Sequence, residues 1–247
     1  MNNLASPSLY FAQWDLRVFE ELSSTQDVAI AAARDGLPGQ LAVIAKRQTA
    51  GRGRAGRAWT APEGNLNFSA MLRPKPAPLL AAAWALLAGV AVYETIVAHL
   101  TATSRLTLKW PNDVLLDGAK LAGVLIDSSL ALDGTVDWVV IGVGVNIASA
   151  PHVEGRATAC LAQAGVTVAP EKLMQALMAE IDRWRETPFA EVRQAWLARA
   201  HPVGTRLRVQ TGGQVIEGAF AGLTEDGKLK LEGAGDAASG DVEIAGI

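Results

Sequence analysis

The sequence contains a single cysteine, Cys160, among its 247 residues. One cysteine cannot form an intramolecular disulfide, and it cannot supply a multi-cysteine zinc site. Both kinds of cross-link are therefore excluded as supports of the fold. We expect a buried, unreactive thiol at this position and a reducing compartment such as the cytoplasm.

Signals for export and for membrane insertion are also missing. The opening residues MNNLASPSLYFAQWD lack a basic segment followed by an apolar core, so they predict no secretory signal. The most apolar run, LLAAAWALLAGVAVY, stops at Glu94. It is shorter than the roughly 20 apolar residues that cross a bilayer. It predicts a buried helix, and we expect no membrane partner.

A large positive charge is absent as well. The formal net charge of −3 argues against a protein whose whole surface binds DNA or RNA, because such binding depends on neutralising phosphates. Positive charge is nevertheless concentrated on one short segment that has no acidic residue and contains Lys46, Arg47, Arg52, Arg54 and Arg57. This segment is expected to bind an anion.

The centre of that segment is the loop GRGRAGRAW at residues 51–59. A dinucleotide-binding turn with the same glycine spacing would open a helix, but Pro62 and Gly64 follow here and prevent one. The Walker pattern is absent too. A flexible, solvated connection and a loop that closes around a phosphate ester both remain possible. Trp59 offers a flat face for a nucleobase, although a tryptophan is more often part of a core.

Helical and strand-like patterns alternate along the rest of the chain. A helix is expected from about Thr25, with Ser24 and Asp27 forming a variant of the capping box and Gly36 ending it. Strand-like runs flank the glycine-arginine loop, and a long helix is expected from about Pro78. Further strands are expected from about residue 105, two helices from about residue 171, and a tail of short strands from about residue 205.

The segment KWPNDVLLDGAKLAGVLID at residues 109–127 forms a second group of polar residues. Pro111 keeps the preceding residue extended, so Asn112 and Asp113 are presented at a turn. Lys120 begins an apolar strand, where it either extends to solvent or faces a polar site in which a fixed cation is strongly favoured. Gly123 permits close approach of a ligand to the backbone.

Four segments, SSTQD, QTAGRGRAGRAW, KWPNDVLLDGAKLAG and GVGVN, occur in an order and spacing that resemble the biotin protein ligase family. The resemblance extends from about Arg17 to Ile247. It implies an α+β fold in which a class II synthetase-like mixed β-sheet catalytic domain (1–202) is packed with helices. A small C-terminal SH3-like β-barrel (203–247) follows. Only about sixteen residues precede the first segment, which implies the ligase-only form without an N-terminal DNA-binding domain, and therefore no DNA partner.

The resemblance also implies a reaction. Biotin and ATP, the latter with Mg²⁺, give biotinyl-5′-AMP and diphosphate, and a lysine of the biotin carboxyl carrier protein of acetyl-CoA carboxylase then takes the biotin as an amide. No enzyme nucleophile is required. The protein has to align two anions and neutralise the charge between them.

The roles of individual residues follow from the resemblance. Lys120 and Arg54 are expected to be catalytic, with Lys120 bridging the biotin carboxyl oxygen and the α-phosphate. Biotin is expected to contact Ser24, Thr25, Gln48, Arg52, Lys120 and Gly123. The nucleotide is expected to contact Arg52, Arg54, Trp59, Asn112, Lys120 and Asn146. Asp113 is the candidate ligand for Mg²⁺.

Three positions depart from the family pattern. Gln26 replaces an asparagine, Ala55 replaces an arginine found in some members, and Asp127 stands where glutamate is frequent and is given no role. Two other functions stay open: a lipoate or octanoate ligase of the same superfamily, and a nucleic-acid-binding module. The tail from residue 205 has seven acidic and four basic residues, which disfavours the latter. A monomer and a homodimer are both compatible with the sequence.

Overall fold

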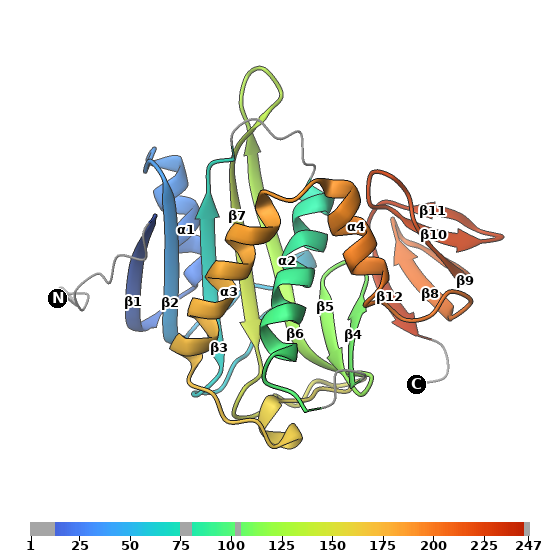
Figure 1. Ribbon diagram of the computed structural model, residues 1–247, viewed down its shortest axis with the longest axis horizontal. Helices are drawn as coiled ribbons and strands as arrows, with labels where there is room; N and C mark the ends of the chain where they lie inside the picture. Colours follow the sequence, from blue (N-terminus) through green and yellow to red (C-terminus); the bar gives the residue numbers. More distant parts are fainter. Residues whose placement is uncertain (1–12, 75–80, 102–104, 245–247) are drawn as a thin grey trace.

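The computed structural model describes residues 13–74, 81–101 and 105–244, and its centre is a seven-stranded mixed sheet (Figure 1). The strand order is β1-β2-β3-β7-β6-β5-β4. β1 and β2 pair in parallel, and the remaining neighbours are antiparallel. The strands are β1 (Trp14–Leu22), β2 (Gln40–Gln48), β3 (Leu66–Leu72), β4 (Leu106–Lys109), β5 (Asp113–Leu116), β6 (Ala119–Leu130) and β7 (Val136–Val145).

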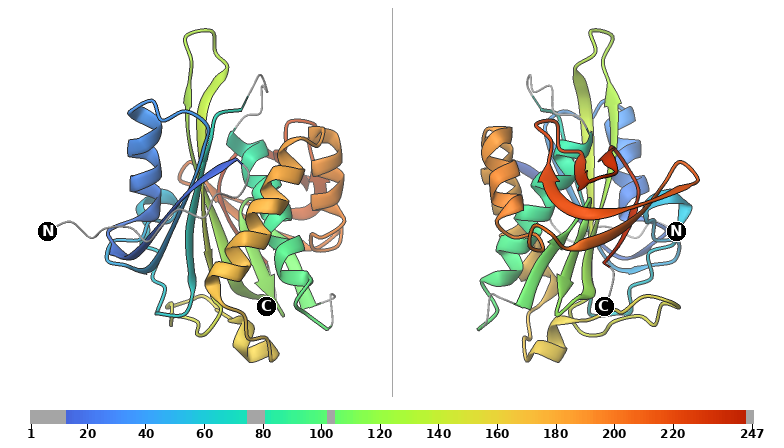
Figure 2. Two further views of the ribbon diagram at one scale, coloured as in Figure 1. Left: turned by 60° about the vertical axis from the view of Figure 1, so that its left-hand side comes forward. Right: turned by 90° about the vertical axis from the view of Figure 1, so that its right-hand side faces the viewer.

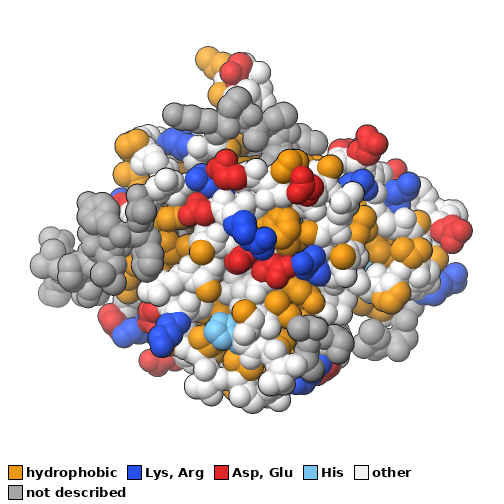
Figure 3. Space-filling view, viewed as in Figure 1, with side chains coloured by type: hydrophobic (Ala, Val, Ile, Leu, Met, Phe, Trp, Pro, Cys, Tyr) orange, Lys and Arg blue, Asp and Glu red, His pale blue; other side chains and the backbone are white. Residues whose placement is uncertain are grey.

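Helices cover both faces of this sheet (Figure 2). One face carries α1 (Thr25–Arg34), and the other carries α2 (Ala81–Val97), α3 (Pro170–Arg185) and α4 (Phe189–Leu197). The outer surface of the latter layer carries charged side chains of both signs near its middle (Figure 3). Two 3₁₀ turns, η1 (Arg54–Gly56) and η3 (Leu161–Ala164), lie in connections. This arrangement confirms the predicted α+β class.

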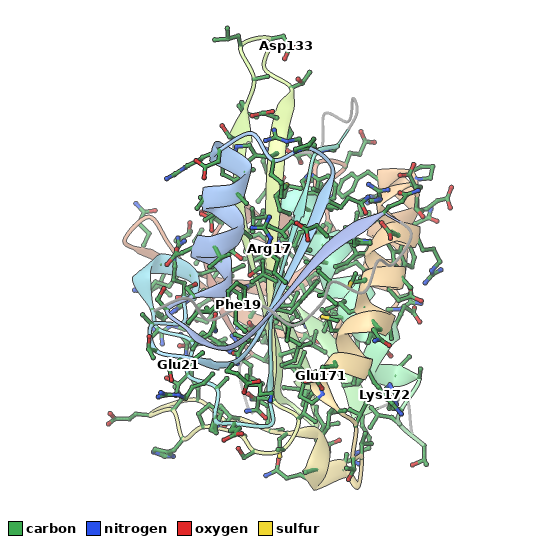
Figure 4. The ribbon with its side chains drawn as sticks, turned by 90° about the vertical axis from the view of Figure 1, so that its left-hand side faces the viewer. Arg17, Phe19, Glu21, Asp133, Glu171 and Lys172 are labelled. Atoms are coloured by element: carbon green, nitrogen blue, oxygen red, sulfur yellow. The ribbon has the colours of Figure 1, made fainter. Side chains whose placement is uncertain are left out.

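Burial follows from this layering. β3 is buried along its whole length because helices lie on both faces of the sheet. β1, by contrast, is an edge strand, and its Arg17, Phe19 and Glu21 are only partly covered or exposed (Figure 4). The hairpin between β6 and β7 extends beyond the sheet to a tip at Asp133 (Figure 4). Cys160 is buried, as expected.

The long helix expected from Pro78 is present as α2, although its predicted start lies outside the described residues. Alanines and other apolar residues make up most of α2, and nearly all its described side chains are buried. The helix packs against α3 and α4 on one side and against β6 on the other. Within the described part of the chain, no helix is long and apolar enough to cross a membrane.

The start of α1 differs from the prediction. α1 begins at Thr25 as expected, but the Ser24 side chain makes no capping hydrogen bond, so the predicted capping box does not form. The first N–H of the helix, that of Thr25, instead donates to Oε1 of Gln48 at 2.7 Å. A side chain from β2 thus satisfies one of the free donors at the helix N-terminus.

A second, five-stranded antiparallel sheet occupies the C-terminal part, with order β11-β10-β9-β8-β12. Its strands are β8 (Arg206–Thr211), β9 (Gln214–Leu223), β10 (Leu229–Glu232), β11 (Gly235–Ala237) and β12 (Asp241–Ile244). The short strand β11 was not predicted, because its three residues carry no strand pattern. The sheet is compatible with the expected SH3-like module.

The second sheet shares its core with the first part of the chain. Leu207 and Phe220 belong to the same buried cluster as Trp196 of α4 and Trp110 after β4. The Trp110 indole N–H also donates to the carbonyl of Gly227, at 3.2 Å. Removing the C-terminal sheet would therefore expose these large apolar side chains to water.

His201 lies at the junction of the two parts. Its ring contacts that of Phe220 edge to face, with 4.6 Å between the ring centroids. The side chain is buried, and neither ring nitrogen has a hydrogen-bond partner among the described residues. Burial, together with the positive charge of Lys109, lowers the pKa of His201 from 6.5 to about 4.

This lowered pKa predicts an acid-dependent loss of stability. The native state favours neutral His201, so its contribution is fully present above pH 6.5 and is lost as pH falls from 6.5 through 4. Between pH 7 and pH 4 the loss from this residue is about 3 kcal/mol. His201→Phe keeps the aromatic contact and removes the titration. Urea unfolding at both pH values should show a smaller decrease in unfolding free energy for the variant, and equal decreases would contradict the assignment.

Candidate active site

A row of residues across the α1-covered face of the sheet forms the floor of the candidate site. Asn67 of β3 pairs with Gly144 of β7, which pairs with Gly123 of β6, which in turn pairs with Asp113 of β5. Directly opposed residues of antiparallel strands share one face, so the two polar side chains flank two glycines. The middle of the row is therefore bare backbone, open to close approach.

Trp59 covers this glycine floor. A Cβ atom at Gly144 would overlap the indole ring, and one at Gly123 would lie 3.4 Å from its Cζ3 atom. Only glycine at position 144 allows the ring to lie on the sheet. The indole N–H is buried and has no partner among the described residues. The Gly123 backbone expected to face biotin is thus covered by Trp59 in this structure.

Lys120 reaches the same floor because β6 contains an irregularity. The pairing of β5 with β6 shifts register between Val114 and Leu115, so Lys120 lies opposite Leu115 and on the same face as Gly123. Such a bulge redirects a side chain to the other side of a strand. The Lys120 ammonium lies 5.7 Å from the centroid of the Trp59 ring. The ammonium faces the polar site and does not extend to solvent.

Asp113 joins two lysines. Its Oδ1 lies 2.6 Å from Nζ of Lys120, and its Oδ2 lies 3.2 Å from Nζ of Lys109. Burial alone would raise the pKa of the Asp113 carboxyl, but the two ammonium groups outweigh burial and hold this pKa below its usual value. The carboxylate is therefore ionised at neutral pH.

These contacts bear on the prediction of a metal ion at Asp113. Both carboxylate oxygens already face ammonium groups, so neither is free to coordinate a cation in this arrangement. Among the residues that the structure describes, no group of three or more Asp, Glu, His or Cys side chains forms a metal site. Binding of Mg²⁺ by Asp113 stays a prediction, and in this arrangement the ion would have to compete with the two ammonium groups.

A chain of buried and half-buried polar side chains lies beside the floor. Gln48 accepts hydrogen bonds from the backbone N–H and the hydroxyl of Thr25, and its Nε2 donates to Oδ1 of Asn67 at 3.1 Å. The Thr25 and Ser69 hydroxyls lie 2.8 Å apart. The Ser24 hydroxyl is buried and has no hydrogen-bond partner in the described part of the chain. The structure thus brings the predicted biotin contacts Ser24, Thr25 and Gln48 together.

The glycine-arginine loop folds over this region as a small hairpin. The N–H of Gly53 donates to the carbonyl of Arg57 at 2.7 Å, and the N–H of Trp59 donates to that of Gly51 at 2.8 Å. Arg54 donates to Oδ1 of Asn112 at 3.1 Å, which brings together two residues predicted to contact the nucleotide. Burial lowers the pKa of Arg54. Its guanidinium nevertheless remains charged at neutral pH, because an arginine is not deprotonated in proteins.

Two other loop arginines bind carboxylates. Arg57 makes a two-pronged contact with Asp241 of β12, with 2.7 Å between Nη2 and Oδ1. The hydrogen bond to Arg57 holds the pKa of Asp241 below its usual value, although partial burial opposes this. Arg52 pairs with Asp27 of α1 at 2.8 Å and lies 3.7 Å from Asp127 of β6. The loop is therefore tied to α1, to the central sheet and to the C-terminal sheet.

Asn146 holds the backbone next to Lys120 in place. It lies buried at the end of β7, where its side-chain N–H₂ donates to the carbonyls of Ala159, at 3.1 Å, and Lys120, at 3.5 Å. These bonds fix the backbone that carries Lys120. Direct contact of Asn146 with the nucleotide stays a prediction.

Several residues of the site were not singled out from the sequence. Asn67 and Ser69 belong to NLNFSAML, in which polar residues recur at every second position of an otherwise apolar strand. Gly142 and Gly144 recur in the same way in β7. Both patterns place polar or bare positions on one face of a buried sheet, and they would have located the floor. The contacts of Arg57 with Asp241 had no signal, because they join distant segments.

Comparison with known proteins agrees with this geometry. The model of the biotin/lipoate A/B protein ligase family matches residues 18–146. A biotin–[acetyl-CoA-carboxylase] ligase of Paracoccus denitrificans is 40% identical over 208 residues, which cover 80% of this chain and 86% of the relative. The match includes the strands and the loop that build the site.

Solved structures extend the similarity to most of the fold. The biotin protein ligase of Aquifex aeolicus in complex with biotin and ATP has a TM-score of 0.75 and 27% identity, covering 92% of this chain and 97% of that one. The biotin protein ligase of Leishmania major in complex with biotinyl-5-AMP has a TM-score of 0.66 and 26% identity, covering 94% and 98%. By sequence and by structure, the chain belongs to the biotin/lipoate A/B protein ligase family.

Proposed function

We propose that the protein is an ATP-dependent biotin protein ligase that forms biotinyl-5′-AMP and transfers biotin to a lysine of a biotin carboxyl carrier protein. The observation that carries the proposal is the Lys120 ammonium, held by a buried carboxylate above a glycine floor. Buried polar side chains suited to a biotin head group lie on one side, and Arg54 with Asn112 lies on the other. The similarity to ligases that bind biotin and ATP supports the same conclusion.

In the first step the biotin carboxylate attacks the α-phosphate of ATP. A carboxylate oxygen–phosphorus bond forms, and the bond from that phosphorus to the diphosphate breaks. Both reactants are anionic, so a fixed cation between them lowers the barrier by neutralising the charge that builds up. We propose that Lys120 has this role and that Arg54 binds the phosphate from the loop side. We propose that Mg²⁺ arrives bound to the ATP phosphates.

In the second step the ε-amine of the carrier lysine attacks the biotinyl carbonyl. A carbon–nitrogen bond forms, the bond to AMP breaks, and the amine loses a proton. The carrier is proposed to be that of acetyl-CoA carboxylase, in line with the names of the relatives. We propose a catalytic domain at 1–202, a C-terminal module at 203–247 and a cytoplasmic location.

Isotope exchange tests the proposed activity and its main alternative. Labelled diphosphate should exchange into ATP when biotin is added, because formation of an acyl-adenylate is reversible. Lipoate and octanoate, added separately, should give little exchange. Exchange that depends on lipoate or octanoate instead would assign the chain to the lipoate side of the family. No exchange with any of the three acids would refute adenylate formation.

Removal of the Lys120 ammonium should slow the first step. Lys120→Ala is expected to lower the rate of biotinyl-adenylate formation by about 2–3 kcal/mol of transition-state stabilisation, a usual loss when one preorganised charge is removed. Single-turnover formation of the adenylate measures this effect directly.

Lys109→Ala is the matched control, because it removes the other ammonium from the same Asp113 carboxylate. The loss of transition-state stabilisation for Lys109→Ala, in kcal/mol, should be less than about a fifth of the loss for Lys120→Ala, because Lys109 does not contact the Trp59 ring. Equal losses in the two variants would mean that neutralising Asp113 is the only role of either lysine.

The C-terminal sheet is proposed to hold the loop closed through Asp241. Asp241→Asn removes the charge that binds Arg57, and a partly exposed pair of this kind contributes about 1 kcal/mol. The closed loop should become roughly fivefold less favoured, so more adenylate should escape to solvent. Biotin labelling of a bystander protein, and cleavage of the loop by trypsin, should both increase.

Glu243→Gln on the same strand is the control, because its exposed carboxylate pairs with Arg208 at 3.7 Å and not with a loop arginine. A point variant is preferred to a truncation, since the C-terminal sheet shares the core of Trp110 and Trp196. If Asp241→Asn labels the bystander no more than Glu243→Gln does, the module does not control the loop.

A further inference from the structure

Gln26 stands at the centre of a buried hydrogen-bond chain that crosses the site. Its Oε1 accepts from the Ser69 hydroxyl at 2.9 Å, and its Nε2 donates to Oδ2 of Asp127 at 2.9 Å and to the carbonyl of Val140 at 3.3 Å. Ser69 in turn contacts Thr25. The amide therefore connects the proposed biotin contacts on α1 with the outer half of β6.

The sheet is shaped to admit this amide. A Cβ atom at Gly142 of β7 would lie 2.5 Å from Oε1 of Gln26, so the glycine leaves the space that the side chain fills. Gln26 is buried, and both Oε1 and Nε2 of its amide have hydrogen-bond partners inside the protein. The orientation of the amide is fixed as a consequence, because reversing it would oppose like dipoles at Ser69 and Asp127.

Asp127 connects Gln26 to the loop. Its Oδ2 is bound by Gln26, and its Oδ1 lies 3.7 Å from Nη2 of Arg52. Arg52 also binds Asp27, so two carboxylates, one from α1 and one from β6, hold the guanidinium from two sides. Arg52 follows Gly51, where a Cβ atom would lie 3.0 Å from Nε2 of Gln48, so the first arginine of the loop begins beside the polar side chains of Gln48 and Thr25.

We propose that Gln26 and Asp127 are positioning residues for biotin binding. The Gln26 amide fixes the Asp127 carboxylate, and this carboxylate, together with Asp27, holds Arg52 over the proposed biotin site. The inference rests on the proposed function, since it assigns these residues to the binding of biotin. It gives Asp127 a role in the site, acting through Arg52 and not by contact with the reacting atoms.

The test measures binding of biotin alone to the full chain by calorimetry. Asp127→Asn keeps an oxygen for Gln26 but loses the negative charge that faces Arg52. It should raise the Kd for biotin roughly fivefold, as expected for a partly exposed ion pair, while the unfolding temperature changes little. In an Arg52→Ala background the same substitution should have almost no effect on Kd, because the group it positions is gone.

A length exchange tests the contact between the two side chains. Gln26→Asn shortens one arm by a methylene group and Asp127→Glu lengthens the other, so each single change disturbs the 2.9 Å hydrogen bond. Each should weaken biotin binding severalfold, and the double variant should recover much of the loss. A merely structural contact between α1 and the sheet would alter the unfolding temperature without this pattern in Kd.

Asp137→Asn is the matched control. Asp137 lies on β7, next to β6, and the substitution removes its carboxylate from a pair with Arg73, away from the site. It should leave the Kd for biotin unchanged. Wild-type affinity in Asp127→Asn, or a full effect of that change in the Arg52→Ala background, would overturn the positioning role alone. Failure of the wild-type protein to bind biotin would overturn the proposed function and this inference with it.

Discussion

The contact between Lys120 and the buried carboxylate of Asp113 is the interaction on which the geometry of the site depends. A carboxylate this deeply buried is costly without a counter-charge, so it keeps the lysine ammonium at the glycine floor. Lys109 binds the other oxygen, and two cations with one anion leave one positive charge in excess. That excess lies next to the indole of Trp59 and the bare glycine floor. In the proposed reaction, a carboxylate and a phosphate would approach each other here at a lower electrostatic cost.

The floor itself results from strand alternation combined with one irregularity. Gly123 and Gly144 share a face because they are directly paired, and the indole lies on them because neither has a side chain. Regular alternation would have directed Lys120 to the opposite face, toward the α2 layer. The shifted pairing after Val114 turns it to the α1 face. The local irregularity of β6 is therefore what unites the lysine with the glycines.

Most of the fold, and the segments that line the candidate site, could be predicted from the sequence because they depend on local patterns, although Asn67, Ser69 and Gly144 were not singled out. The alternation in β6 and β7, the helical spacing in α3 and the glycine-arginine loop each have a signal within a few residues. Three features had none. The Ser24 cap fails because Gln48, distant in sequence, takes the Thr25 N–H. The shifted register at Lys120 and the pairing of Arg57 with Asp241 also have no local signal, because tertiary contacts decide both.

The arginines of the loop differ in what an arriving phosphate would have to displace. Arg52 and Arg57 each bind carboxylates, and a phosphate would have to compete with those charges. Arg54 binds Asn112 and the carbonyl of Gly240, both neutral acceptors, and has no carboxylate within ion-pair distance among the described residues. Neutral acceptors are exchanged for an anion with a net gain in charge-assisted bonding. Because Arg54 is also partly buried, that gain is larger than at the exposed Arg52. Its environment, and not its place in the motif, makes Arg54 the loop arginine suited to the phosphate.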